Sequence, residues 1–122
     1  MVDRRAAIGE LGEEIAARHL RESGMRIVGR RVRLRRGELD IVARDGEEWV
    51  FVEVKTRTSD VMGDAASGMT LKKARSMTRA VVEYLHKNGL EDAPVRCDLV
   101  TVDFDADGGH RLEHHPASIP MI

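Results

Sequence analysis

The chain has 122 residues, of which 42% are hydrophobic and 34% are charged. This balance is typical of globular proteins and excludes a disordered chain, and no run approaches the ~20 consecutive apolar residues of a membrane span. The length is that of one ordinary domain, so we expect a single domain over residues 1–122. The only cysteine, Cys97, rules out an internal disulfide, and together with the charged N-terminus it predicts a cytoplasmic protein without a membrane anchor.

The net charge of −1 argues mildly against a nucleic-acid partner, but the charge is unevenly distributed. Residues 1–90 carry a balance of +4 and residues 91–122 a balance of −5. Six arginines lie within eleven positions: Arg26, Arg30, Arg31, Arg33, Arg35 and Arg36. Such a stripe can neutralise phosphates, and it can equally protect an exposed edge strand from unwanted pairing. Composition alone does not choose between these interpretations.

Apolar periodicity and turn residues predict two helices and five strands. We expect, in chain order, a helix over 3–23 ended by Gly24, strands over 25–35, 37–44 and 48–57, a mobile loop over 58–69, a helix over 71–87 capped by Thr70, and strands over 95–104 and 111–115. In the second strand, Leu39, Ile41 and Ala43 should share a face. The order αβββαββ around one sheet predicts an α/β fold.

Each predicted helix carries a charged residue on an otherwise apolar face. In the first helix, Glu13 lies among small or apolar residues, namely Ala6, Gly9, Ala16, Ala17 and Leu20. In the second helix, Lys73 falls beside Met77 and Ala80. Glu13 is therefore a candidate site residue, whereas Lys73 could serve a site or simply extend its amine to solvent.

The strand over 48–57 contains a carboxylate and a lysine inside an apolar run. Alternation places Glu53 and Lys55 on the same face as Phe51. If Asp45-Gly46 forms a two-residue turn, residues 44 and 47 pair, and Asp40 lies opposite Phe51, one diagonal step from Glu53. Asp40 and Glu53 then share a face, and a slip of one residue would separate them.

Two adjacent carboxylates on a half-buried sheet repel each other unless a cation neutralises them. Oxygen ligands of this kind suit Mg²⁺ or Mn²⁺, and a metal between Asp40 and Glu53 could polarise a phosphate and activate a water. Lys55 could orient that water or offset charge in the transition state. The alternative is a purely structural network of ion pairs among the same three residues.

These residues form motifs that resemble the PD-(D/E)XK nuclease superfamily. They resemble more closely the YraN-like family of small bacterial proteins, which is similar to archaeal Holliday-junction resolvases. The matching motifs are Gly12-Glu13, Gly37-Glu38-Leu39-Asp40-Ile41, Val52-Glu53-Val54-Lys55-Thr56-Arg57, Thr70 with Lys73, and Arg96-Cys97-Asp98-Leu99-Val100. The chain departs from the family pattern at Arg31-Val32, where Asn-Tyr is usual, at Met62, where an aromatic is usual, and at Cys97, where Phe is usual.

The resemblance implies a single nuclease-like domain with a restriction-endonuclease-like mixed central sheet of about five strands flanked by helices. It implies a site built from Asp40, Glu53 and Lys55, with Glu13 and Lys73 as further members and the carbonyl of Val54 as a metal ligand. It also implies a Mg²⁺- or Mn²⁺-dependent endonuclease acting on DNA, branched DNA included, and a homodimer if both strands are cut symmetrically. The alternative is a non-catalytic nucleic-acid-binding or adaptor protein that retains the fold.

Two further polar groups of the sequence favour structural interpretations. The histidines of the segment from His110 to His115 are expected to be exposed near the chain end, rather than to bind a metal. Asp98 shares a strand face with Arg96, which predicts a structural ion pair.

Overall fold

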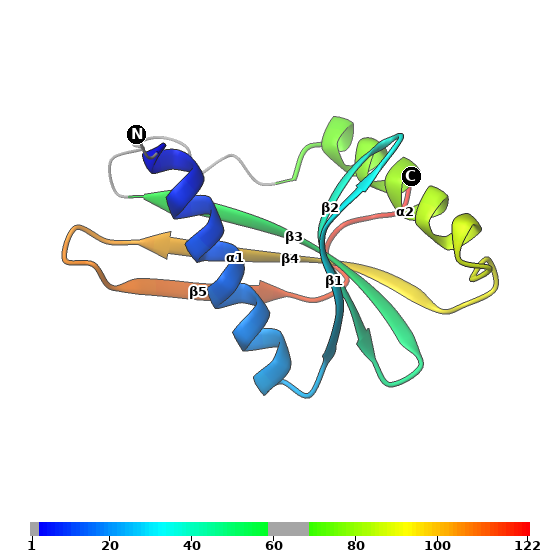
Figure 1. Ribbon diagram of the computed structural model, residues 1–122, viewed down its shortest axis with the longest axis horizontal. Coiled ribbons are helices and arrows are strands. Elements are labelled where there is room, and N and C mark those ends of the chain that lie inside the picture. Colours follow the sequence, from blue (N-terminus) through cyan, green and yellow to red (C-terminus); the bar gives the residue numbers. More distant parts are fainter. Residues whose placement is uncertain (1–2, 59–68) are drawn as a thin grey trace.

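The computed structural model describes residues 3–58 and 69–122, which form a five-stranded mixed sheet flanked by two helices (Figure 1). The elements in chain order are α1 (Arg4–Glu22), β1 (Arg26–Leu34), β2 (Gly37–Asp45), β3 (Glu48–Thr58), α2 (Leu71–Lys87), β4 (Val95–Phe104) and β5 (His110–His115). The predicted order αβββαββ and the predicted mixed α/β fold are confirmed. The expected loop over 58–69 lies outside the described residues except for its two ends, as does Met62.

The strands follow one another across the sheet in the order β1-β2-β3-β4-β5. All neighbours are antiparallel except β3 and β4, which are parallel and run together from the pair Trp49–Val95 to the pair Thr58–Phe104. A parallel pair needs a crossover connection, and α2 belongs to that connection. Neither described helix has the length and apolar character that a bilayer crossing requires.

Both helices begin and end close to where the sequence places them, because their terminal residues satisfy unpaired backbone groups. The Asp3 side chain accepts a hydrogen bond from the N–H of Arg5 at 3.0 Å, and Thr70 Oγ1 accepts one from the N–H of Lys73 at 3.1 Å. Gly24, with φ +94°, follows the first helix and lets the chain turn into β1.

The two faces of the sheet carry separate cores. One core joins α1 to residues such as Ile41, Val52 and Val100, and the other joins α2 to residues such as Phe51 and Val42. The helix α1 approaches the sheet closely at Gly12, where a Cβ atom would collide with the side chain of Thr56. The buried residues of α1 are Gly12, Ala16, Ala17 and Leu20, whereas Ala6 is exposed, so the expected apolar face holds only over the later turns.

The hairpin between β2 and β3 differs in register from the prediction. Asp45 pairs with Glu48, so the two-residue loop is Gly46-Glu47, with Gly46 at φ +63°. The predicted pairing of residues 44 and 47 is therefore wrong by two residues. A shift of two preserves which side chains share a face, and the last pair that β2 and β3 form on the side of Asp40 is Ile41–Val52.

Beyond Ile41, strand β2 leaves β3 while it continues to pair with β1. Opposite Asp40 in β1 lies Arg31, whose φ of +50° is uncommon for a residue other than glycine. At this irregularity the side chains of β2 change sides of the sheet. Ile41 belongs to the core under α1, but Leu39 belongs to the core under α2. The expectation that Leu39 shares a face with Ile41 and Ala43 is therefore wrong, because the strand twists between them.

Candidate functional site

The candidate site lies where β2 separates from β3. Asp40 is the first residue of β2 beyond the paired segment, and its Oδ2 atom accepts a hydrogen bond of 2.8 Å from the main-chain N–H of Val54. The carboxyl groups of Asp40 and Glu53 lie near each other, and each changes the pKa of the other.

The surroundings of this pair favour the protonated form of both groups. Burial is the main cause of the raised pKa of Asp40. The hydrogen bond from the N–H of Val54 lowers this pKa in part, and the negative charge of Glu13 raises it further. Burial, followed by the charge of Asp40, raises the pKa of Glu53 to about 7. Removing two adjacent carboxylates from water is unfavourable unless a positive charge compensates them. The pair is therefore a place where a proton or a cation is needed near neutral pH.

Two lysines lie close enough to Glu53 to act on its charge. Lys73 of α2 and Lys55 of β3 both lower the pKa of Glu53, although less than burial and Asp40 raise it. Glu53 and Lys73 line a shallow pocket of about 180 Å³ between the beginning of β2 and α2. The pocket is otherwise lined by Gly37, Glu38, Met69, Ser76, Met77 and Ala80. Lys73 thus reaches the site region from the second helix, as the sequence allowed.

Glu13 approaches the pair from α1, on the other side of the sheet. Its charge contributes to the raised pKa of Asp40, and its side chain is only 15% exposed. However, Glu13 Oε1 also accepts a hydrogen bond of 3.1 Å from Arg31 Nε. Within residues 3–58 and 69–122, no three His, Cys, Asp or Glu side chains converge as a set of metal ligands. Glu13 is therefore near the carboxylate pair but is held by an arginine.

The donor set at the pair fits Mg²⁺ or Mn²⁺. Mg²⁺ retains several waters in proteins and is usually held by one or two carboxylates, so it does not need a third acidic side chain. Asp40 and Glu53 supply two neighbouring carboxylates, whose pKa values are raised mainly by burial. Hard oxygen donors of this type disfavour zinc relative to Mg²⁺ or Mn²⁺.

Sequence reasoning missed two parts of this arrangement. The N–H of Val54 holds Asp40 in place, whereas the sequence drew attention only to the Val54 carbonyl. In the sequence, Arg31 belongs to the basic stripe that could bind phosphates. In the structure, its side chain forms ion pairs with Glu13 and with Glu10. Neither contact has a local sequence signal, since each depends on the separation of β2 from β3 and on the placement of α1.

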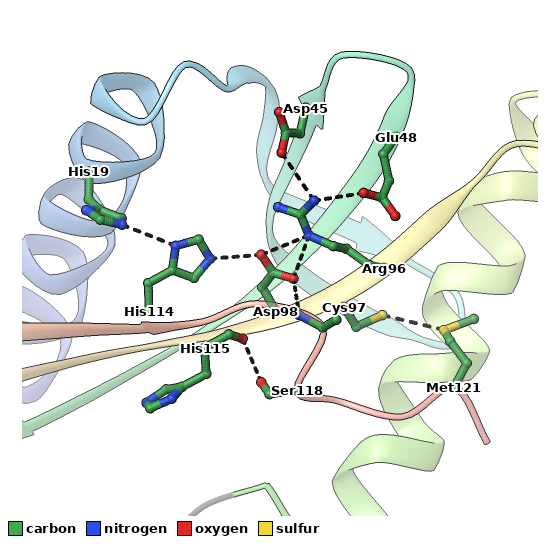
Figure 2. A network of polar contacts seen from close by, with 11 residues as sticks. His19, Asp45, Glu48, Arg96, Cys97, Asp98, His114, His115, Ser118 and Met121 are labelled. Atoms are coloured by element: carbon green, nitrogen blue, oxygen red, sulfur yellow. Dashed lines mark hydrogen bonds and ion pairs between the residues drawn. The ribbon is translucent and has the colours of Figure 1, made fainter.

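A second polar network lies away from this pair, around Asp98 in β4 (Figure 2). Asp98 is fully buried, and its carboxylate accepts hydrogen bonds from Arg96 Nε at 3.1 Å and from the N–H of Ala117 at 2.8 Å. His114 Nε2 lies 2.8 Å from Asp98, and the opposite ring nitrogen of His114 lies 3.2 Å from His19 of α1. The predicted ion pair of Asp98 with Arg96 is present.

The same network corrects one expectation about the histidines near the chain end. The His114 side chain is only 13% exposed and bridges β5 to α1, whereas an exposed position was expected. The other two histidines of the segment, His110 and His115, are exposed. His114 pairs with Val100, whose side chain lies in the core under α1, so the His114 side chain is directed to the same face and reaches His19. The network holds β4, β5 and α1 together.

Comparison with known proteins places these features in a family. Residues 12–102 match the Uncharacterised protein family UPF0102. The chain belongs to the UPF0102 family. It is 46% identical over 117 residues to a UPF0102 protein of Anaeromyxobacter dehalogenans, an alignment that covers 95% of this chain and 86% of the relative. It is 41% identical over 115 residues to a UPF0102 protein of Pelotomaculum thermopropionicum, with 93% and 96% covered.

The UPF0102 match confirms the resemblance to the YraN-like family. The matched segment of 12–102 contains all five side chains proposed for the site: Glu13, Asp40, Glu53, Lys55 and Lys73. It ends before β5 and thus before His114. The UPF0102 match therefore covers the candidate site completely, and the network around Asp98 only in part.

Proposed function

We propose that this protein is a metal-dependent nuclease of the PD-(D/E)XK type, which hydrolyses phosphodiester bonds of DNA with Mg²⁺ or Mn²⁺. The observation that carries the proposal is the closeness of the Asp40 and Glu53 carboxyl groups where β2 leaves β3. In a structural ion-pair network, neighbouring lysines would hold both carboxylates in their charged form. Here the two lysines near Glu53 do not offset burial and the charge of Asp40, and both carboxyl groups have raised pKa values.

The roles of the residues follow from their positions. Asp40, Glu53 and the main-chain carbonyl of Val54 would hold the metal, which polarises a phosphate and lowers the pKa of a bound water. Lys55 shares the face of Glu53 and supplies a positive charge for orienting that water or stabilising charge on the phosphate. Lys73 lines the adjacent pocket and would contact a substrate phosphate. Glu13 adds negative charge beside Asp40 and thereby favours cation binding.

The natural substrate is proposed more narrowly from the resemblance to Holliday-junction resolvases. Branched DNA is the expected substrate, and a homodimer is the expected form, since two sites are needed for symmetric cuts in two strands. The expected location is the cytoplasm, where such a substrate is found.

Cleavage assays with matched variants test the proposal. We expect wild-type protein with Mg²⁺ or Mn²⁺ to cut labelled linear, single-stranded or four-way DNA, and EDTA to abolish the activity. Asp40→Asn and Glu53→Gln should each lower the rate by about two orders of magnitude or more, because each removes a metal ligand. Glu47→Gln is the control, because Glu47 is an exposed carboxylate in the same hairpin. Activity that survives both site substitutions would exclude this site.

A non-catalytic adaptor is the alternative, and calorimetric titration separates it from the nuclease. The nuclease proposal expects Mg²⁺ or Mn²⁺ to bind wild-type protein, and binding to be lost in Glu53→Gln. If no metal binds at millimolar concentrations and no DNA is cut, the adaptor becomes the better interpretation.

A further inference from the structure

A groove of about 660 Å³ lies between the turn that joins β1 to β2 and the exposed side of α2. The two elements lie against each other at one end of the molecule (Figure 1). The groove is lined by Arg35, Arg36, Thr78, Arg79, Val82, Glu83, His86 and Lys87. Four of these residues are permanently cationic near neutral pH and one is a carboxylate, so the groove is strongly positive in a chain whose net charge is −1.

The cations of the groove differ from three other arginines of the basic stripe. Arg30, Arg31 and Arg33 each form an ion pair with a glutamate of α1 or β2. Among the ion pairs found in the described parts of the chain, none involves the side chains that give the groove its charge, those of Arg35, Arg36, Arg79 and Lys87. Three arginines of the stripe thus form ion pairs, whereas Arg35 and Arg36 form none among the described residues, although Arg35 and Lys87 lie near enough to Glu83 to lower its pKa.

The one carboxylate of the groove holds the arginine turn in place. Glu83 of α2 accepts hydrogen bonds from the main-chain N–H groups of Arg35 at 3.0 Å and Arg36 at 2.9 Å. Both carboxylate oxygens are therefore used to fix the backbone of the turn against the helix. The two arginine side chains extend from a positioned backbone, and less conformational entropy is lost when they bind a ligand.

The groove and the candidate site share their walls. The helix α2 supplies Lys73 and Ala80 to the site pocket and Arg79 to the groove, and the turn that carries Arg36 continues directly into Gly37 of the pocket. From Arg79 to Lys87 the helix advances about 12 Å, the length of roughly three to four nucleotides of one DNA strand. A strand bound in the groove would therefore pass beside the site.

We propose that this groove binds the phosphate backbone of the DNA strand that flanks the cleaved bond. The inference rests on the proposed function for its substrate, and on the groove itself for its location. Positive side chains spaced along a helix suit a regular row of phosphates. The exposed side chain of Val82 offers an apolar contact to the sugars between them. Glu83 is a positioning residue for the turn.

Salt-dependent DNA binding in EDTA tests the groove independently of cleavage. A short fluorescein-labelled duplex would be titrated by fluorescence anisotropy with wild-type protein and with the triple variant Arg36→Ala/Arg79→Ala/Lys87→Ala. Loss of three phosphate contacts should flatten the plot of log affinity against log salt by roughly three units, and lower affinity by roughly tenfold or more. The control is Arg18→Ala/Arg21→Ala/Arg111→Ala, which removes the same charge from exposed positions in α1 and β5.

The outcomes separate this inference from the proposed function. If the groove triple loses binding while wild-type protein cuts no DNA, the groove stands and the nuclease proposal fails. If wild-type protein cuts DNA and the groove triple binds with an unchanged salt slope, the groove is excluded while the nuclease stands. Equal losses in both triples, or no DNA binding by wild-type protein, also overturn the groove. Equal affinity for polyglutamate of matched charge would assign it to an acidic protein instead.

Discussion

Asp40 Oδ2 accepts a hydrogen bond of 2.8 Å from the main-chain N–H of Val54, at the point where β2 separates from β3. The last main-chain pair between β2 and β3 on this side is Ile41–Val52, so β2 offers no main-chain acceptor to the N–H of Val54. The Asp40 carboxylate takes that place. Asp40 therefore has two functions: one oxygen completes the hydrogen bonding of the sheet, and the group as a whole belongs to the carboxylate pair. Substitutions at Asp40 must be chosen with both functions in mind.

Two substitutions at Asp40 distinguish these functions in the metal-free protein. Asp40→Asn keeps an oxygen acceptor for Val54 and removes a charge beside Glu53, so we expect the free energy of unfolding to stay the same or rise. Asp40→Ala leaves the N–H of Val54 without an acceptor, and we expect a loss of about 1–3 kcal/mol. Urea denaturation in EDTA, followed by Trp49 fluorescence, measures both. A structural ion-pair network predicts instead that Asn destabilises the protein as much as Ala does.

The raised pKa of Glu53 predicts an unusual pH dependence of stability. The folded protein holds a proton on Glu53 up to about pH 7, whereas the unfolded chain releases it near 4.5. The stabilisation that this proton provides is therefore fully present below pH 4.5 and is lost as the pH rises to about 7, a decrease of about 3 kcal/mol. Denaturation in EDTA across this range measures it. The decrease should be absent in Glu53→Gln and reduced by saturating Mg²⁺, and the same decrease in Glu53→Gln would assign it to other groups.

Two glycines of α1 should respond in opposite directions to the same substitution. A Cβ at Gly12 collides with the side chain of Thr56, whereas nothing lies within 4 Å of a Cβ at Gly9. Gly9→Ala should stabilise the protein by up to about 1 kcal/mol through helix propensity. Gly12→Ala should destabilise it by about 1–3 kcal/mol, because the helix must move away from β3. Thermal and urea unfolding of the two variants provide the comparison. If both variants gain stability, the close approach of α1 to β3 is excluded.

The network around Asp98 should contribute strongly to stability and not to activity. Asp98→Ala removes the acceptor of His114 and of the Ala117 N–H from a fully buried position, so we expect a loss of about 3–5 kcal/mol. Asp107→Ala is the matched control at an exposed turn position, with an expected effect within about 0.5 kcal/mol. Urea denaturation compares the two variants. A loss at Asp98 no larger than that at Asp107 would mean that the network contributes little.

Cys97 should be unreactive in the folded protein. Its side chain is buried in β4, and burial, together with the charge of Asp98, raises the pKa of the thiol to about 11. At pH 7 only about one molecule in ten thousand would carry the reactive thiolate. Labelling with a chromogenic disulfide reagent should therefore be slow in buffer and complete in urea. Fast labelling in buffer would show that β4 opens locally.

Much of the fold follows from the sequence because local chemistry decides it. Asp3, Gly24 and Thr70 mark helix ends through groups that satisfy the backbone, and their positions depend on no distant residue. The closeness of Asp40 and Glu53 across one hairpin was likewise accessible, because an error of two residues in the register moves them by only one diagonal step.

The remaining features depend on contacts between segments distant in sequence. A hairpin loop at Asp45-Gly46 and one at Gly46-Glu47 differ by one residue in position and by two residues in register. Local sequence does not decide between them, because the choice depends on how β3 packs in the sheet. The change of face between Leu39 and Ile41 occurs opposite Arg31, whose φ is positive. An arginine in the sequence does not indicate a positive φ, so this irregularity could not be predicted. The burial of His114 depends on Asp98 and on α1, which are separated from it by 16 and 95 positions.

The parallel pairing of β3 with β4 determines the order in which the chain can assemble. The hairpin of β2 and β3 is closed by a two-residue loop and can form within microseconds, whereas β4 joins only after the crossover that includes α2. Asp40 and Glu53 therefore meet early, while water still screens their charges. We expect their repulsion to grow when α1 and α2 cover the two faces of the sheet, so the electrostatic cost of the pair belongs to the late, desolvating stage of folding.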